Sequence, residues 1–389
     1  MEFWFWFCLL LVFYTYLGYG IVLFILVKIK KVFVKSRSFD PNYQPAVTLV
    51  VPAFNEESFI MEKVKNSLEL DYPKDKLRIL FVTDGSNDNT YQILKEAAGV
   101  EVSHEDRRAG KAAAENRAMT LIDTPIVVFC DANTYLNKDC IKNLVRHYDD
   151  PKVGAVSGEK RVLSSGADTA SAAGEGLYWK YESALKKWDS ELYTIVGAAG
   201  ELISFRSELV QDLEEDTILD DFMQTMRICQ KGYRVVYEPE SYAAETASDN
   251  VTEELKRKVR IAAGGWQSMS RLWKILIPIP QPLLSFQYIS HRVLRWSISA
   301  FVLPLIFILN IFLFAQSWMY EYLLYAQVVF YVTALIGWFL ENRAIRVKLL
   351  FVPYYFLMMN YAVFAGFGRW LKGSQKATWE RAKRAELKS

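Results

Sequence analysis

Hydrophobic positions follow two different patterns along this chain. Long uncharged runs lie near both ends, whereas the middle alternates short apolar runs with amphipathic stretches. The uncharged runs are residues 3–27, 296–320, 322–340 and 349–368. Helices of 19 to 25 residues rise about 28 to 37 Å, and the hydrocarbon core of a bilayer is about 30 Å thick. We therefore predict a membrane-spanning helix in each run.

The middle of the chain has the pattern of strands that alternate with helices. We expect strands at residues 47–54, 77–83, 100–103 and 126–130, and helices near 57–70, 89–98, 111–121 and 220–231. Strands separated by helices imply right-handed crossovers and a parallel sheet. Their nearly continuous apolar character fits a sheet covered on both faces. The predicted fold class is α/β, a Rossmann-like doubly wound domain.

Polar residues follow each of these strands, among them Asn55, Asp84, Lys111 and Asp131. Open parallel sheets bind ligands outside the carboxyl ends of their strands, so we predict a ligand site at this edge. Helix capping would explain one such turn but explains four poorly. The chain lacks GxGxxG after a strand and lacks GxxxxGK[ST], so the dinucleotide and P-loop interpretations have no motif.

Charge indicates how the chain is oriented. The formal net charge is only +2, and we expect no nucleic-acid partner. Lys28, Lys30 and Lys31 follow the first uncharged run and only Glu2 precedes it, so the large middle region should be cytoplasmic. The tail after residue 368 has seven Lys or Arg against two Glu, yet four full crossings would place it outside. Either the fourth run is re-entrant or the tail departs from the rule.

Six motifs in family order carry a resemblance that covers about residues 45–265. They are PAFNEE (52–57), VTDGSNDNT (82–90), RRAGKAAAENRA (107–118), FCDAN (129–133), LDD (219–221) and RKVRI (257–261). The chain resembles membrane-integrated family 2 glycosyltransferases of the GT-A fold and is similar to hyaluronan, chitin-oligosaccharide and cellulose-type synthases. The implied domains are an N-terminal transmembrane helix (1–31), a glycosyltransferase domain (45–257), interfacial amphipathic helices (258–295), C-terminal transmembrane helices (296–368) and a basic tail (369–389).

The resemblance implies a role for each motif. Substrate-binding residues would be Pro52, Asn55, Glu57, Asp84, Lys111, Gly200, Arg257 and Arg260. Among these, Asp84 would hold the nucleotide base or ribose, and Lys111 would lie near the diphosphate at a helix start, where phosphate oxygens are stabilised. Asp131 and Asn133 would hold Mg²⁺ or Mn²⁺, with Asn133 a neutral and weaker ligand than the usual second aspartate.

Asp221 matches the catalytic base of the family, and Asp220 matches a supporting residue. Inversion at the anomeric carbon needs a carboxylate that takes the proton of the acceptor hydroxyl. The alternative is that both carboxylates only favour the dipole of the helix that they begin. The chain departs from the family at Ile261, where a tryptophan would stack on the acceptor sugar, and Trp266 lies about 140° further round the helix. His291 is expected to face either the site or the lipid headgroups.

We therefore expect an inverting glycosyltransferase that acts on a nucleotide sugar donor, with UDP-hexose or UDP-N-acetylhexosamine as the expected donor. Its acceptor would be a growing glycan at the cytoplasmic face of the plasma (inner) membrane, in a multi-pass protein that contacts the lipid bilayer and has a cytoplasmic catalytic domain. One alternative is transfer of a single sugar to a polyprenyl or other lipid-linked acceptor. Another is a non-catalytic membrane scaffold.

Overall fold

The computed structural model of the chain describes residues 1–34, 39–40, 42–163, 170–246, 251–341, 343 and 347–375. Most of the basic tail lies outside the described residues. The strands are β1 Val47–Ala53, β2 Leu77–Asp84, β3 Glu101–Glu105, β4 Ile126–Cys130, β5 Tyr135–Leu136, β6 Val153–Leu163, β7 Leu202–Arg206 and β8 Arg234–Thr246. The four strands predicted from the sequence are thus confirmed.

The strands form one eight-stranded sheet in the order β3-β2-β1-β4-β7-β6-β8-β5. The first four in this order are parallel, as predicted. The other half of the sheet is mixed, because β6 and β8 pair parallel, whereas β7 pairs antiparallel with both β4 and β6, and β5 pairs antiparallel with β8. Strands β7 and β5 therefore run opposite to the other six strands of the sheet.

The helices include the four expected in the middle of the chain. They are α1 Glu2–Phe13, α2 Tyr19–Phe33, α3 Ile60–Leu68, α4 Thr90–Glu96, α5 Lys111–Met119, α6 Cys140–Val145, α7 Ala170–Leu192, α8 Asp220–Gln230, α9 Val251–Arg271, α10 Pro282–Tyr288, α11 Ser299–Leu313, α12 Trp318–Glu341 and α13 Lys348–Leu371. Two π-helical segments, η1 Tyr14–Gly18 and η6 Ile289–Ile298, join α1 to α2 and α10 to α11. Short 3-10 turns are η2 Lys74–Lys76, η3 Arg146–Asp149, η4 Ser207–Leu209, η5 Trp273–Leu276 and η7 Phe314–Gln316.

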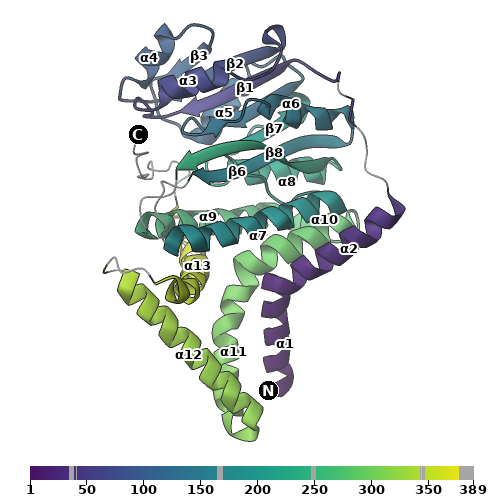
Figure 1. Cartoon of the computed structure of the whole chain (residues 1–389), viewed down its shortest axis with the longest axis vertical. Helices are drawn as coiled ribbons and strands as arrows, with labels where there is room; N and C mark the ends of the chain where they lie inside the picture. Colours follow the sequence, from purple (N-terminus) through teal and green to yellow (C-terminus); the bar gives the residue numbers. More distant parts are fainter. Residues whose placement is uncertain are drawn as a thin grey trace.

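The elements lie in three tiers (Figure 1). The sheet and its covering helices occupy one end of the molecule. Helices α2, α7, α9 and α10 form a middle tier beneath it, and α1, α11 and α12 extend away from that tier. Side chains alternate in direction along a strand, so β1 packs into a core on each face of the sheet. Val50 enters one core, and Leu49 and Val51 enter the other.

The core on the Val50 face does not end with the predicted catalytic domain. It includes buried side chains from α9, η5 and α10, which the sequence analysis assigned to a separate interfacial region. These are Met269, Leu272, Ile275, Leu284 and Tyr288. The predicted boundary at residue 257 therefore cuts through one hydrophobic core.

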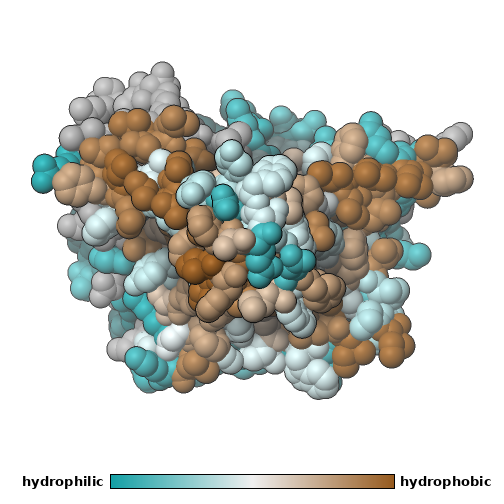
Figure 2. Space-filling model, turned by 90° about the horizontal axis from the view of Figure 1, so that it is seen from below, coloured by the Kyte–Doolittle hydropathy of each residue, from teal (hydrophilic) through white to brown (hydrophobic). Residues whose placement is uncertain are grey.

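Four helical segments are long and apolar enough to cross a membrane: Glu2–Phe33, Pro282–Gln316, Trp318–Glu341 and Leu349–Leu371. They match the four uncharged runs, but the second begins at Pro282 because α10, η6 and α11 are continuous. In each segment, at most a third of the most apolar stretch is buried inside the protein. Seen from below, apolar residues cover wide areas of this end of the molecule (Figure 2). Exposed apolar surface on this scale is typical of proteins that contact lipid.

Helix α13 is oriented differently from the other candidate spans. Figure 1 shows α1, α11 and α12 along the length of the molecule, whereas α13 is seen almost end-on beside α9. The two helices approach closely at Gly366, where an added Cβ would lie 2.5 Å from the Cβ of Ala262. Helix α13 therefore lies crosswise beneath the catalytic domain.

Candidate active site

A pocket opens where the carboxyl ends of β1, β2 and β4 meet. Five of the predicted binding residues line it: Pro52, Asp84, Lys111, Asp131 and Asn133. The pocket is open to solvent, and the space between its walls is about 670 Å³. We call it the edge pocket. The sheet topology thus brings together motifs that are up to 80 residues apart in the sequence.

Asp84 organises the loop in front of α5. Its carboxylate accepts hydrogen bonds from the backbone N–H groups of Ala109, at 3.1 and 3.2 Å, and of Gly110, at 2.7 Å. The next residue, Gly85, has φ +65°, and an added Cβ would lie 2.5 Å from the backbone nitrogen of Arg108. A glycine is needed there, because the loop could not otherwise close over the end of β2.

Asn55 and Glu57 hold two loops together beside the pocket. The side chain of Asn55 exchanges hydrogen bonds with Asn87, at 2.7 and 2.9 Å. The carboxylate of Glu57 accepts from the backbone and side-chain nitrogens of Asn89, at 3.2 and 2.8 Å. The structure does not bring Glu57 into the pocket lining, where its neighbour Glu56 stands instead. Glu56, and not Glu57, is therefore the glutamate placed to contact a substrate in this pocket.

Lys111 is the first residue of α5 and lies at the centre of a carboxylate cluster. Its Nζ is 2.8 Å from Asp131, 3.6 Å from Asp220 and 3.8 Å from Glu115. Burial alone would lower the pKa of Lys111, but the three carboxylates together raise it well above its usual value. The ammonium therefore stays charged and holds the acids together.

The sequence analysis gave no role to Glu115. Burial, and then the charge of Asp220, raise its pKa well above the usual range. The sequence could have predicted this contact, because Glu115 follows Lys111 by four residues on a helix and such residues share a face.

Beside Lys111 lies a second, small cavity with Asp220 and Asp221 in its wall. Asp221 packs against Gly200, where an added Cβ would lie 2.7 Å from Oδ2 of the carboxylate. Its Oδ1 accepts a hydrogen bond from the N–H of Phe222 at 2.7 Å. Gly200 was expected to bind substrate, and in the structure its missing side chain makes room for the carboxylate of Asp221.

Burial raises the pKa of Asp221 to about 7, with the neighbouring charge of Asp220 as the next cause. A base must be unprotonated to act, so activity should be low below this pKa and rise through it. We therefore expect kcat/KM to increase about tenfold per pH unit below pH 7 and to level off above it. Initial rates from pH 5 to 9 measure this. A flat profile over pH 5 to 8 would contradict the role of Asp221 as the base.

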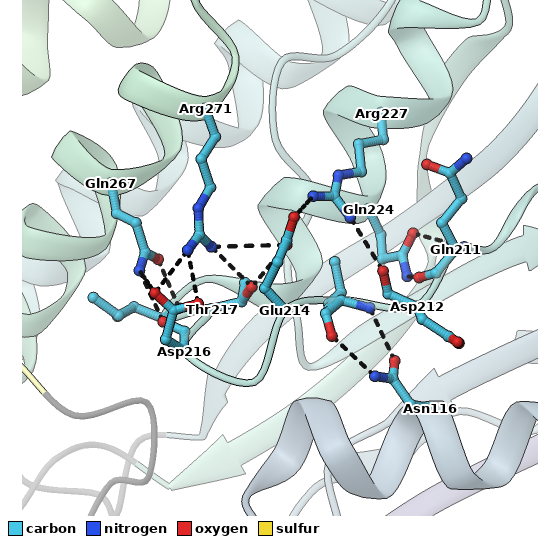
Figure 3. Close-up of polar contacts among 12 residues, drawn as sticks. Asn116, Gln211, Asp212, Glu214, Asp216, Thr217, Gln224, Arg227, Gln267 and Arg271 are labelled. Atoms are coloured by element: carbon cyan, nitrogen blue, oxygen red, sulfur yellow. Dashed lines mark hydrogen bonds and ion pairs between the residues drawn. The ribbon is translucent and has the colours of Figure 1, made fainter.

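The segment before Asp220 is held by side chains from three helices (Figure 3). These are Asn116 of α5, Gln224 and Arg227 of α8, and Gln267 and Arg271 of α9. Asn116 bonds to the N–H and C=O of Leu213, at 3.1 and 3.0 Å. Arg271 donates to both carboxylate oxygens of Asp216 at 2.7 Å. The approach to the two aspartates is thus fixed by contacts far from it in the sequence.

The two arginines of the RKVRI motif are not among the residues that line the edge pocket. Arg257 donates to both oxygens of Glu254, at 2.9 and 3.0 Å. Arg260 donates to the carbonyl of Ile218 at 3.3 Å, close enough for Asp220 and Asp221 to act on its pKa. Burial is the larger effect and lowers the pKa of Arg260. Their role in substrate binding stays a prediction.

Neither hydrophobic residue near this motif offers a ring to the edge pocket. Ile261 packs against the core. Trp266 packs on α13, with ring centroids 4.6 Å from Phe367 and 5.9 Å from Trp370. Trp266 therefore does not replace the tryptophan that the family has at position 261.

The residues present at the edge pocket fit a hard divalent cation. Asp131 and Asn133 both line it, and a carboxylate and an amide oxygen are ligands that such cations accept. Asp131 already pairs with the positive charge of Lys111. Among the described residues, no group of three or more His, Cys, Asp or Glu side chains is placed to hold an ion. The protein alone would therefore hold a metal weakly.

Comparison with known proteins agrees with this geometry. Residues 48–213 match the model of glycosyl transferase family 2. A poly-beta-1,6-N-acetyl-D-glucosamine synthase of Staphylococcus aureus is 27% identical over 58% of this chain and 56% of its own length. A beta-monoglucosyldiacylglycerol synthase of Nostoc is 27% identical over 63% of this chain and 55% of its own length. The chain thus spans about half the length of these curated relatives.

A solved structure shares nearly the whole fold. A mannosyltransferase from Pyrobaculum calidifontis, in complex with GDP-mannose and Mn²⁺, superimposes with a TM-score of 0.68 and 24% identity. The match covers 90% of this chain and 97% of that one. The chain therefore contains a glycosyl transferase family 2 domain with a GT-A fold, set between helices long and apolar enough to cross a membrane.

Proposed function

We propose that the protein is an inverting enzyme that transfers a sugar from a nucleotide diphosphate sugar to a growing glycan at the cytoplasmic face of the membrane. The observation that carries this proposal is the placement of Asp221. A half-buried carboxylate with a raised pKa lines the second cavity, and Lys111 lines both this cavity and the edge pocket. A base must stand beside the donor without contacting its diphosphate, and this arrangement meets that need.

The edge pocket and the second cavity, which both contain Lys111, then serve different parts of the reaction. In the edge pocket, Lys111 and the N-terminus of α5 bind the donor diphosphate. Asp131 and Asn133 hold Mg²⁺ or Mn²⁺, which neutralises charge on the leaving diphosphate when it is bound. In the second cavity, Asp221 accepts the proton of the acceptor hydroxyl, and Asp220 keeps the pKa of Asp221 high through its charge.

A second candidate is transfer of one sugar to a lipid-linked acceptor. Two observations favour it. The glycolipid synthase matches slightly more of this chain than the polysaccharide synthase does. The acceptor-stacking tryptophan of polymerising relatives is absent, since Ile261 packs into the core. The two candidates share the donor chemistry and differ in the product.

One experiment tests the function and separates the candidates. The purified full chain in lipid nanodiscs is incubated with a panel of UDP- and GDP-sugars, with and without oligosaccharide or polyprenyl phosphate acceptors. Release of the nucleoside diphosphate is measured, and products are separated by size. A ladder supports glycan elongation, and a single glycolipid supports the second candidate. Release no faster than that of Asp221→Asn with every donor would refute both.

We further propose that the catalytic domain and the tail lie on the same, cytoplasmic side. Lys28 and Lys31 mark the domain end of the first span as cytoplasmic. Crosswise packing of α13 on α9 supports a chain with three crossings, in which α13 lies along the membrane. This arrangement agrees with the basic tail, which four full crossings would place outside.

Single cysteines and a membrane-impermeant maleimide measure this topology in intact cells. Gln316→Cys, between α11 and α12, should label in intact cells. Asp212→Cys in the catalytic domain and Ser389→Cys in the tail should label only after permeabilisation. Labelling of Ser389→Cys in intact cells would show that α13 crosses.

A further inference from the structure

The second membrane helix carries charged side chains that are buried against the catalytic domain. In η6, His291 is 1% exposed and Arg292 is 8% exposed. His291 lies between Asp189, at 2.6 Å, and Glu182, at 3.3 Å. It therefore faces neither the catalytic site nor the lipid headgroups, contrary to both expectations. Buried charge is costly unless it is paired, so such a cluster needs a reason.

Glu182 of α7 forms ion pairs with two arginines of this helix. Arg292 and Arg295 each reach one of its carboxylate oxygens at 2.9 Å. Arg292 makes a further contact, because its Nε donates to the carbonyl of Val196 at 2.6 Å. The two arginines thus share a partner, and the contact to Val196 distinguishes Arg292.

Val196 begins the loop that ends at Gly200, against which Asp221 packs. Within this loop Gly197 has φ +107°, and an added Cβ would lie 2.7 Å from the ring of Phe222. Phe222 directly follows Asp221 in α8. The loop therefore contacts both the proposed base and the residue that follows it.

Trp296, one turn beyond Arg292, packs against the same part of the catalytic domain. Its ring centroid is 5.0 Å from that of Phe222 and 5.4 Å from the guanidinium of Arg292. It packs into α9 at Gly265, where an added Cβ would lie 2.7 Å from the ring. The membrane helix therefore contacts both segments that surround Asp221.

We propose that Arg292 is a positioning residue, through which the second membrane helix sets the loop of residues 196–200 and with it the acceptor side of the catalytic site. The fork of the guanidinium bonds to a carboxylate and a carbonyl at once, which the single ammonium of lysine does less well. This inference rests on the proposed function for its acceptor site. It assigns to Arg292 no contact with the donor.

The test compares Arg292→Gln with Arg295→Gln, which removes the same charge from the same partner. In Arg292→Gln we expect acceptor KM to rise, and the ratio of sugar transfer to donor hydrolysis to fall, by roughly 10- to 100-fold. Donor affinity, measured by calorimetry, should stay within about twofold, since the contact of the loop with the donor side, from Nζ of Lys111 to the carbonyl of Gly200, is long at 3.5 Å. Arg295→Gln should keep the transfer ratio of the wild type. Arg292→Lys, which keeps the pair with Glu182, should lie between the two.

Hydrogen exchange gives a second readout that needs no activity. Amides of residues 196–200 should exchange faster in Arg292→Gln and Arg292→Lys than in Arg295→Gln or the wild type. Equal exchange in all four proteins would overturn the inference, as would a parallel loss of donor affinity. A wild-type protein without activity on any donor refutes the proposed function instead, and the exchange result then decides the role of Arg292 alone.

Discussion

Asp221→Asn is expected to lower kcat by roughly 10²- to 10⁴-fold and to leave donor affinity within about twofold of the wild type. The substitution removes the proton acceptor but keeps an oxygen that can accept the N–H of Phe222, so the local backbone contact survives. Single-turnover rates with saturating donor, together with calorimetric titration of the donor, measure the two quantities. A variant that retains more than half of the wild-type rate would move the role of base to another residue.

Asp220→Asn is the matched control for that variant. It removes a neighbouring carboxylate of the same helix turn, whose charge helps to raise the pKa of Asp221. The rising limb of the pH profile should therefore shift to lower pH, with activity retained on the plateau. A collapse of activity at every pH would assign Asp220 a direct part in the chemistry.

Asp131→Ala is expected to lower activity by at least about 10²-fold, because several kcal/mol of charge stabilisation on the leaving diphosphate depend on a divalent cation. Asn133 is a neutral ligand, so excess EDTA should abolish wild-type activity readily, and Mg²⁺ or Mn²⁺ should restore it. Asp131→Asn keeps one oxygen for the metal and should lose less. Full activity in EDTA, with metal content measured, would contradict the proposed cation requirement.

The sequence predicted the parallel half of the sheet because those strands are short apolar runs that end in polar turns. It missed β6 and β8, which are 11 and 13 residues long and carry charged residues such as Lys160 and Glu238 along their length. The pairing partners of these charges come from distant parts of the chain. Lys160, for example, is held by Glu201 and Glu245. Local patterns contain no record of such pairing.

The candidate site also has a part that local motifs predict and a part that depends on the folded structure. Motifs placed Asp84, Lys111 and Asp131 at one edge, since strand ends in a parallel sheet must meet. They could not distinguish Glu56 from Glu57, because the direction of these side chains depends on the turn at Asn55, whose φ is +54°. Arg292 was missed for a related reason. A run that reads as the start of a membrane helix gives no indication that one face is buried against a catalytic loop.

The core on the Val50 face has a consequence for how this enzyme can be divided. Leu80, Ile203 and Phe222 share that core with Met269, Leu272 and Tyr288. Ending the chain at residue 257 would remove these last three side chains and expose part of that core to water, so we expect the shortened domain to be less stable and less soluble. Grafting the domain onto another anchor would fail for the same reason. The helices after residue 257 form part of the core of the enzyme. We therefore expect the catalytic domain and these helices to depend on each other for folding.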